Sequence, residues 1–409
     1  MEKKFYELSH KERIDALILE GYPKEALDLI SKPSDVSELE KTIENVIGVG
    51  TLPIGIIKDF VMNKKKYLVP MMIEEPSVVA AANKASKLLL PDGFIAESLG
   101  NEMIGECLIK VEDSKKAEKL AIKNMEKIDK KGKELSSSLE KYGGGWRGLE
   151  FRPFKSERGD YLVCYFYVNV ADAMGANRVN SVAEELGPFI ADLTDGMPIM
   201  GILSNLAVRR IVGAKAIWKK EKIGKEGVDG VLEAFNFASN DIFRLCTNNK
   251  GIMNGIDAVA LATGNDWRAV EAGLHTYSMM NKKPLVSYRE ENGDLVGVFE
   301  GPLAVAITGG ATKTFNHSKA SLALLNVSSA VELAQVMACV GLANNFAALF
   351  ALSTEGIQKG HMRLHSRNIA IQAGAKSPEE IDFVASELVR EGKYDTEKAR
   401  KALDDFRKL

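Results

Sequence analysis

The chain is short of the features that mark disulfide-stapled, zinc-binding and nucleic-acid-binding proteins. It has only four cysteines in 409 residues, and no two of them form a CxxC pair, so neither disulfides nor a zinc ribbon is expected. The formal net charge of −2 gives no attraction to nucleic acid or to an anionic membrane. We therefore expect neither as a partner.

Long apolar runs are also scarce. The charged start lacks the apolar stretch of an export signal, and the longest apolar run, 336–352, is interrupted by Asn344 and Asn345. No membrane span is predicted, and a reducing cytoplasm fits the unpaired cysteines. The rest of the composition is ordinary for a globular protein, with 45% apolar and 27% charged residues. The length predicts two or three domains of roughly 150 residues each.

Periodicity predicts an α+β fold in which one module interrupts another. Between residues 104 and 206 the order is strand, helix, strand, strand, helix, strand, as in a ferredoxin-like module. The expected elements are 103–111, 113–139, 148–155, 161–170, 177–195 and 198–204. Residues 1–103 and 207–355 then form one large, mainly helical domain around this insertion.

A helical tail is expected over residues 356–409. Ser377 and Glu380 form the pattern of a capping box, with proline at the first helical position, and Asp395 begins a last helix. The tail therefore predicts a small helical domain at the end of the chain.

Three familiar signatures fail in their context. Residues 143–148 match GxGxxG but follow a helix and lead into a strand, the reverse of a Rossmann phosphate turn. His361 and His365 have zinc-protease spacing, but Met362 stands where that motif needs glutamate, so no metal site is predicted. Residues 309–314 end like a P-loop without its first glycine, which disfavours ATP binding.

Charges in apolar, glycine-rich surroundings are the first candidates for a site. Lys250 lies in such a segment, and the next charges along the chain are Asp257 and Asp266. Ionised groups are rarely buried singly, so the lysine and an aspartate are expected to be partners.

Two further segments have both a functional and a structural interpretation. Glu75 precedes the apolar helix 76–89, where it either complements the helix dipole or, once desolvated, holds a proton near neutrality. Residues 172–177 are small and lie between a strand and a helix. They form either a site for a phosphate or pyrophosphate or an ordinary capped turn.

Seven segments between about residues 40 and 375 carry a family resemblance. They are ENVIG at 44–48, EEPS at 74–77, DAMGAN at 172–177, NKGIMNGID at 249–257, ATGNDWRAVEAG at 262–273, GGATKT at 309–314 and TEGIQKGHMRLH at 354–365. In this order they resemble the 3-hydroxy-3-methylglutaryl-CoA (HMG-CoA) reductases, and more narrowly the soluble class II branch.

The resemblance implies both an architecture and a reaction. It implies a large domain that binds HMG-CoA, an inserted non-Rossmann NAD(P)-binding domain, a mobile C-terminal flap, and a homodimer with active sites between subunits. The implied activity is an oxidoreductase that interconverts HMG-CoA with mevalonate and CoA, using two NAD(P)H. The choice between NAD and NADP stays open, as does the direction in the cell.

The resemblance assigns catalysis to Glu75, Lys250, Asp266 and His361. Lys250 would stabilise the oxyanion that each hydride transfer creates. Asp266 would fix the lysine and link it to Glu75, whose proton would pass to the alkoxide. His361 would protonate the CoA thiolate, a task that suits an imidazole at neutral pH, and His365 would give structural support.

Binding residues are implied in the same way. The hydroxymethylglutaryl part would be held by Ser77, Arg244 and Asn254, with the guanidinium on the free carboxylate. The dinucleotide site would be lined by Asp172, Met174, Gly175, Ala176, Asn177 and Asn205. The chain departs from the family pattern at Asn248, where a histidine is common, and at Gly148, where an acidic residue is common.

Two alternative functions are kept open. A non-catalytic CoA or nucleotide sensor on the same fold would be expected to lack at least one of the four catalytic residues. Another CoA-thioester enzyme would need no nicotinamide site.

Overall fold

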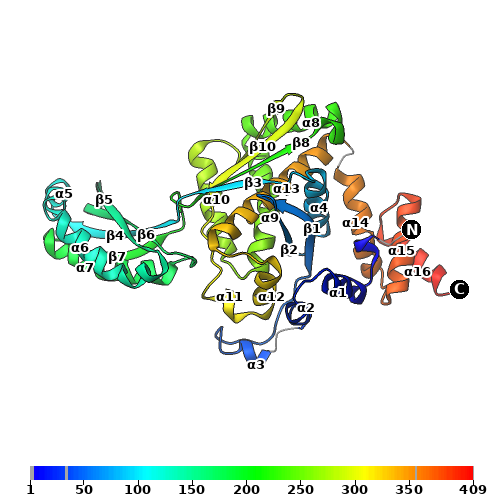
Figure 1. Ribbon diagram of the computed structural model, residues 1–409, viewed down its shortest axis with the longest axis horizontal. Helices are drawn as coiled ribbons and strands as arrows, with labels where there is room; N and C mark the ends of the chain where they lie inside the picture. Colours follow the sequence, from blue (N-terminus) through cyan, green and yellow to red (C-terminus); the bar gives the residue numbers. More distant parts are fainter. Residues whose placement is uncertain (1–3, 33–35, 355–356, 409) are drawn as a thin grey trace.

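Apolar side chains gather in separate cores along the chain. The largest core draws on residues 57–96 and 212–349, and a second is built within residues 103–207. The chain thus leaves the first core, builds the second and returns, as an insertion does. Figure 1 shows the second core's elements projecting at the left of the molecule. The computed structural model describes residues 4–32, 36–354 and 357–408, apart from the side chains of residues 38 and 357–364.

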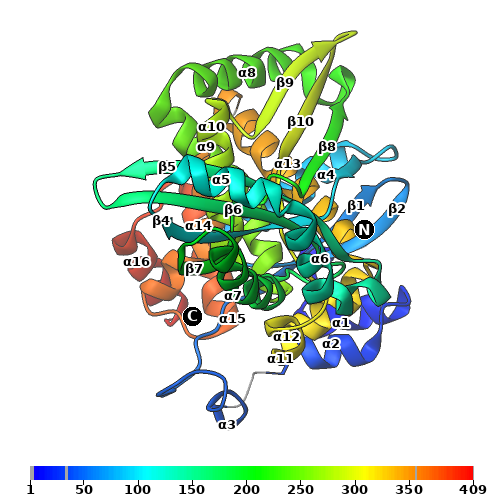
Figure 2. The same cartoon turned by 90° about the vertical axis from the view of Figure 1, so that its left-hand side faces the viewer.

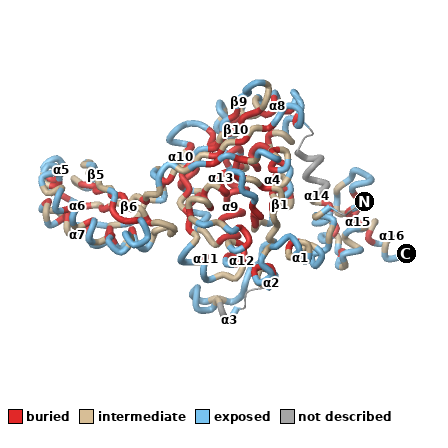
Figure 3. The backbone as a smooth tube through the Cα atoms, in the orientation of Figure 1, coloured by how far each residue is buried: buried red, intermediate tan, exposed pale blue. Residues whose placement is uncertain are grey.

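Helix α13 (Ala330–Ser353) forms the centre of the largest core. Its residues are apolar on every face, so the helix can be buried all round, and Figure 3 shows this part of the molecule as buried. It packs against α4 (Pro76–Leu88), α8 (Lys220–Asn240) and α9 (Ile242–Ala262). Among the described residues it alone is long and apolar enough to cross a bilayer, but 67% of its apolar window is buried inside the protein. Here it is a core helix.

The large region contains more sheet than the predicted mainly helical domain. Strands β1 (Ile54–Met62) and β2 (Lys65–Met72) form a hairpin. A four-stranded antiparallel sheet has the order β3-β8-β10-β9. Its strands are β3 (Ile95–Leu99), β8 (Ile211–Trp218), β9 (Val286–Glu291) and β10 (Asp294–Pro302). In β8 buried and half-buried residues alternate strictly, as expected of a strand with one face on a core.

The interrupting segment has the predicted order of elements. Its four strands pair antiparallel in the order β5-β6-β4-β7, and helices cover one face of the sheet (Figure 2). The elements are β4 (Glu102–Val111), α5 (Ser114–Lys123), α6 (Met125–Ser136), β5 (Gly145–Ser156), β6 (Gly159–Asn169), α7 (Ala176–Leu193) and β7 (Met197–Ser204).

One predicted helix of this segment is divided. The expected helix 113–139 is broken at Asn124, which ends α5 with φ −98° and ψ 11° and precedes α6. Its side-chain amide donates to the carbonyl of Leu120 at 2.9 Å. Local side-chain bonding of this kind lets asparagine compete with helix continuation.

The remaining helices cover the large region and form the tail. Those of the large region are α1 (His10–Leu19), α2 (Lys24–Ile30), α3 (Val36–Leu39), α10 (Trp267–Asn281), α11 (Ala311–Thr314) and α12 (Asn316–Leu325), and short 3-10 turns span Phe5–Glu7 and Ser137–Tyr142. The tail helices are α14 (Ile357–Gln372), α15 (Pro378–Glu391) and α16 (Thr396–Phe406), which share a small core. The predicted capping box at Ser377 and the helix start at Asp395 are confirmed.

Candidate active site

Glu75 is the N-cap of helix α4. Its Oε1 accepts hydrogen bonds from Ser77 N at 3.3 Å and from Ser77 Oγ at 2.8 Å. Pro76 fills the first helical position, where its missing N–H costs least. The Glu75 side chain keeps 30% of its exposure, so the predicted desolvation is only partial in a single chain. The carboxylate therefore complements the start of the helix, and the holding of a proton by Glu75 stays a prediction.

The tail lies against this carboxylate. His365 of α14 places its Nε2 3.3 Å from Glu75 Oε1, so one turn of α14 lies beside the start of α4. His361 belongs to the same helix, but its side chain is outside the described residues. Its proposed role in catalysis stays a prediction.

Lys250 projects from α9 into solvent. It is exposed and forms no hydrogen bond or ion pair with the side chains that the structure describes. The two residues before it anchor the helix inward: Asn248 accepts from Asn345 of α13 at 2.9 Å, and Asn249 donates to Ser278 of α10 at 2.7 Å. These buried amides fix the rotation of α9, and that rotation turns Lys250 outward.

Arg244, Lys250, Asn254 and Asp257 all lie on α9 and are not fully buried. Steps of three, four and seven residues from Lys250 or Asn254 keep Asn254 and Asp257 on the lysine's side of the helix. The backbone of Arg244 is capped by Asp241, but its Nε is buried and has no hydrogen-bond partner among the described residues. A buried guanidinium nitrogen without a partner is a suitable donor for an incoming carboxylate.

Asp257 faces a second carboxyl group across the α9–α10 contact. Burial first, and then the neighbouring Glu271, raise the pKa of Asp257 well above its ordinary value, while Lys250 acts in the opposite direction. Two carboxyl groups this close favour sharing one proton. The lysine's side of α9 therefore contains a carboxyl group with a raised pKa as well as a cation.

Asp266 lies far from Lys250 in the same chain. It caps α10 through Ala269 N at 3.1 Å, and its nearest cation is Arg268, at 3.5 Å. The helical stretch from Lys250 to Ala262 is about 18 Å long at the usual rise per residue, and the four-carbon stem of lysine cannot cover it. The predicted contact between Lys250 and Asp266 is therefore not formed within one chain.

The 172–177 turn leads from β6 into α7. Gly175 is the N-cap of α7 with φ +97°, and a Cβ there would lie 2.5 Å from Val170, so only glycine fits. No side chain caps the first turn of this helix, and none of its residues there is acidic. Backbone N–H groups at an uncapped helix start suit the phosphates of a dinucleotide.

Asn205, predicted at the same site, lies where the chain returns to the large region. Its carbonyl approaches helix α10 so closely that a Cβ at Gly273 would lie 2.7 Å away. The glycine of the 262–273 motif thus permits contact between α10 and the returning chain. Asp172 is engaged elsewhere, since its Oδ1 accepts from Ala330 N at the start of α13, at 2.9 Å.

Known proteins share both the sequence pattern and the fold of this chain. The chain matches the family described as hydroxymethylglutaryl-coenzyme A reductase over residues 9–366. It is 44% identical to the 3-hydroxy-3-methylglutaryl-coenzyme A reductase of Archaeoglobus fulgidus, over 98% of this chain and 94% of that protein. It also matches the structure of the class II enzyme of Streptococcus pneumoniae bound to NADPH in open conformations. That match has a TM-score of 0.82 and 35% identity, and it covers 98% of this chain and 100% of the other.

This chain belongs to the HMG-CoA reductase family. The resemblance read from the seven motifs, including the class II branch, is confirmed, and so is the prediction of an enzyme of this kind. Among the described residues no group of three histidine, cysteine or acidic side chains is arranged to hold a metal ion.

The two departures from the HMG-CoA reductase pattern have different surroundings. Asn248 is buried and bonded to Asn345, which in turn accepts from Tyr288 at 2.9 Å, so the asparagine serves the packing of α9. Gly148 follows a bulge in β5 and has φ +121°. The glycine fits a backbone conformation that other residues adopt only under strain.

Sequence reasoning missed three polar residues beside these sites. Glu271 faces Asp257, Asn265 precedes Asp266, and Arg210 is buried near the 172–177 turn. Asn265 and Glu271 lie inside a quoted HMG-CoA reductase motif, which is a usable signal. Arg210 lies in none, and its sequence neighbours give no indication that it is buried.

Proposed function

We propose that the protein reduces HMG-CoA to mevalonate and CoA with two equivalents of NADH or NADPH, in the cytoplasm and in the mevalonate pathway or its reverse. The observation that carries the proposal is family membership over residues 9–366 with all four predicted catalytic residues present. A sensor would not need to retain them. The S. pneumoniae relative binds NADPH, and the uncapped start of α7 fits such a ligand here.

The residues of this chain then act as follows. A bound reduced nicotinamide supplies hydride to the thioester carbonyl and later to the aldehyde. Lys250 donates to the oxygen that becomes negative in both steps, a cationic donor being among the strongest contributions a site can make. Arg244 holds the free carboxylate with its unpartnered Nε, beside Ser77 and Asn254. His361 protonates the departing thiolate, and Glu75 supplies the proton for the alkoxide.

The separation of Lys250 from Asp266 supports a shared site in a homodimer. Since one chain cannot join them, we propose that Lys250 of one subunit meets Asp266 of the other. Exposed apolar side chains surround the start of α9, and Phe243 keeps 83% of its exposure. The apolar patch consists of Phe237, Ile242, Phe243, Met279 and Met280. A patch of this kind on a soluble chain marks a surface for another protein.

The same proposal assigns a separate role to each segment of the chain. Residues 1–103 and 207–355 bind HMG-CoA, residues 104–206 carry the dinucleotide, and residues 356–409 act as the flap. The contact of His365 with Glu75 supports a tail that reaches the site.

The test is consumption of reduced nicotinamide at its absorbance band. NADH and NADPH are supplied separately with HMG-CoA, and the reverse reaction is run with mevalonate, CoA and each oxidised cofactor. Two equivalents oxidised per thioester are expected with at least one cofactor. The proposed activity would be refuted if neither cofactor showed a change in absorbance that depends on HMG-CoA in the forward direction or on mevalonate and CoA in the reverse direction.

A further inference from the structure

A segment outside the helices and strands, residues 305–308, lies between the Asp266 turn and the 172–177 turn. It follows strand β10, and Val305 and Ala306 are almost fully buried. Its backbone is held on both sides by side chains and carbonyls that come from distant parts of the chain. The segment is therefore a physical link between two parts of the proposed active site.

On the Asp266 side, the link is the amide of Asn265. Its Oδ1 accepts from Ala306 N at 2.7 Å, and its Nδ2 donates to Ala306 O at 3.1 Å. One side chain thus fixes both backbone groups of Ala306. Asn265 directly precedes Asp266, the N-cap of α10. A shift of the segment would therefore also shift Asp266.

On the other side, the link is the backbone of Asp172. Its carbonyl accepts from Ile307 N at 3.1 Å and from Thr308 Oγ1 at 3.2 Å. Its carboxylate is held by Ala330 N at the start of α13. The first residue of the 172–177 turn is therefore fastened to the large region at three points.

Arg210 joins the segment and the turn through one guanidinium. It is 3% exposed, and its Nη2 donates to Val305 O at 3.0 Å. Its Nη1 lies 3.4 Å from the carbonyls of Ala173 and Met174. Burial lowers the pKa of Arg210 to about 10, and Asp172 opposes that change. A buried cation whose direct partners are carbonyls is costly to a fold, so a purely structural benefit is a weak explanation for it.

We propose that residues 305–308 form a spacer that sets the position of the dinucleotide relative to Asp266, and that Arg210 and Asn265 are positioning residues of the reaction. This inference rests on the proposed function, since it takes the 172–177 turn as the dinucleotide site. Misplacement of reacting groups by about 1 Å can cost roughly 100-fold in rate. The hydrogen bonds with Asn265 on one side and with Asp172 and Arg210 on the other limit such movement of the segment.

The first test compares two neighbouring arginines. Arg210→Lys keeps the charge but removes the fork that reaches three carbonyls. Arg209→Lys is the matched control, because Arg209 lies over the ring of Tyr167 at 3.6 Å and pairs with Glu102 at 3.0 Å, away from the turn. The dissociation constants of NADPH, NADH and CoA are measured by fluorescence quenching and calorimetry.

We expect Arg210→Lys to raise the dissociation constant of the preferred dinucleotide about tenfold, the effect of one or two lost hydrogen bonds, and to leave that of CoA unchanged. Arg209→Lys should change neither. Equal weakening by both variants, or unchanged dinucleotide binding by folded Arg210→Lys, would overturn the role of Arg210. Wild-type protein that binds neither dinucleotide would instead refute the proposed function.

Two further variants keep the test decisive if Arg210→Lys does not fold. Thr308→Val removes one hydroxyl at an exposed position, and it should weaken dinucleotide binding roughly threefold. Asn265→Ala should lower kcat about 100-fold while dinucleotide affinity changes less than threefold. If Arg210→Lys is unfolded, unchanged dinucleotide affinity in Thr308→Val would overturn the proposed spacer. Unchanged kcat in Asn265→Ala would also overturn it.

Discussion

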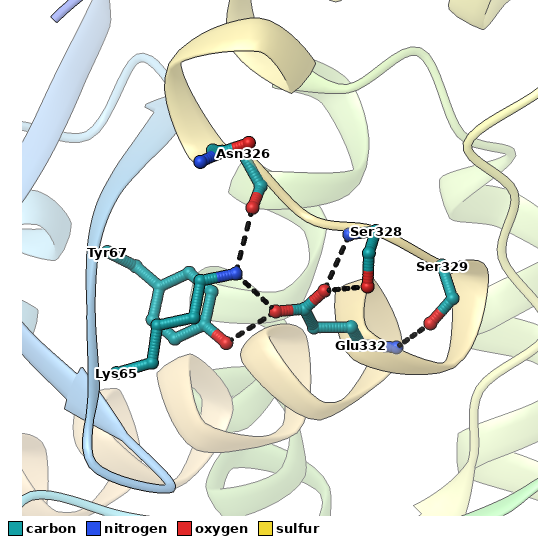
Figure 4. A network of polar contacts seen from close by, with 6 residues as sticks. All are labelled: Lys65, Tyr67, Asn326, Ser328, Ser329 and Glu332. Carbon is teal, nitrogen blue, oxygen red and sulfur yellow. Dashed lines mark hydrogen bonds and ion pairs between the residues drawn. The ribbon is translucent and has the colours of Figure 1, made fainter.

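Two polar clusters on central helices of the large region are built in opposite ways. At the start of α13, the carboxylate of Glu332 accepts from Lys65 at 2.7 Å, from Tyr67 at 2.6 Å, and from the N–H and hydroxyl of Ser328 (Figure 4). On the exposed side of α9, Lys250 has no partner among the described side chains, and the buried Nε of Arg244 has none either. One cluster is complete within the chain, and the other is not.

The difference separates a structural cluster from a functional one. Partial burial alone would favour the neutral form of Glu332, but the bonds from Lys65, Ser328 and Tyr67 lower its pKa to about 2. That carboxylate stabilises the junction of β2 with α13. A buried donor left unsatisfied, such as the Nε of Arg244, is expensive unless a ligand or another chain completes it. The α9 cluster is therefore where HMG-CoA and a second subunit are expected.

The largest effect should come from Lys250→Ala. Removing the proposed oxyanion donor should lower kcat about 1,000-fold on both HMG-CoA and mevaldehyde, and leave the free energy of unfolding nearly unchanged because the exposed lysine forms no hydrogen bond or ion pair with the described residues. Lys225→Ala, an exposed lysine on α8, is the control. Turnover in Lys250→Ala within tenfold of wild type would contradict its role.

His361→Gln should have the next largest effect on activity. Loss of a proton donor for the CoA thiolate should reduce turnover of the thioester about 100-fold, while reduction of added mevaldehyde, which releases no thiolate, should fall far less. Steady-state rates on the two substrates measure the difference. Equal losses on both would remove the assignment of His361 to the sulfur.

Glu332→Gln tests the complete cluster. An amide cannot accept in place of both carboxylate oxygens, so the free energy of unfolding should fall by about 2 kcal/mol, with activity per folded molecule retained. Denaturant unfolding measures the change, and Glu291→Gln, which breaks an exposed pair with Arg289, should cost less than about 0.5 kcal/mol. The same loss in both variants would show that the network adds nothing.

The pH dependence of Glu332 has a definite sign. Its folded pKa of about 2 lies below its ordinary value of 4.5, so its contribution is present above the ordinary value and is lost as the pH falls through the folded one. The gap between wild type and Glu332→Gln should therefore close between pH 4.5 and pH 2.

Asp257→Asn should have the smallest effect, with the opposite pH trend. The pKa of Asp257 is raised by burial and by Glu271, so folding favours the neutral form of the acid. That stability is present below the ordinary pKa and is lost as the pH rises toward the raised one. Asparagine does not ionise, so the variant should gain about 1 kcal/mol over wild type at pH 8 relative to pH 5. Parallel stability curves would contradict the shift.

The sequence predicted the inserted segment better than the sheets around it. In 104–206 strand β6 contains a continuous apolar and aromatic run from Tyr161 to Val168. Strand β8 has no such run, because glycine, alanine and lysine occupy half of its positions, and only its pattern of burial between β3 and β10 marks it as a strand with one face on a core. The break at Asn124 was missed because the apolar stripe continues through it.

The sequence predicted which residues belong to the candidate site, but not which of them contact one another within the chain. Glu75, Ser77, Lys250 and Asp266 were found from charges and motifs, but the expected contact of lysine with aspartate is not formed in one chain. A sequence cannot show whether two charges meet within a chain or between chains. Arg210 escaped prediction for a related reason, since its partners are carbonyls distant in sequence and carry no residue signal.

The most direct test of the account mixes two inactive variants. Lys250→Ala and Asp266→Asn homodimers are unfolded together, refolded and assayed. If each site takes its lysine from one subunit and its aspartate from the other, a mixed dimer has one intact site, and random mixing should restore about a quarter of wild-type activity. If one chain instead supplies both residues to its own site, every site in every dimer lacks either the lysine or the aspartate. No recovery beyond the separate variants would contradict the shared site.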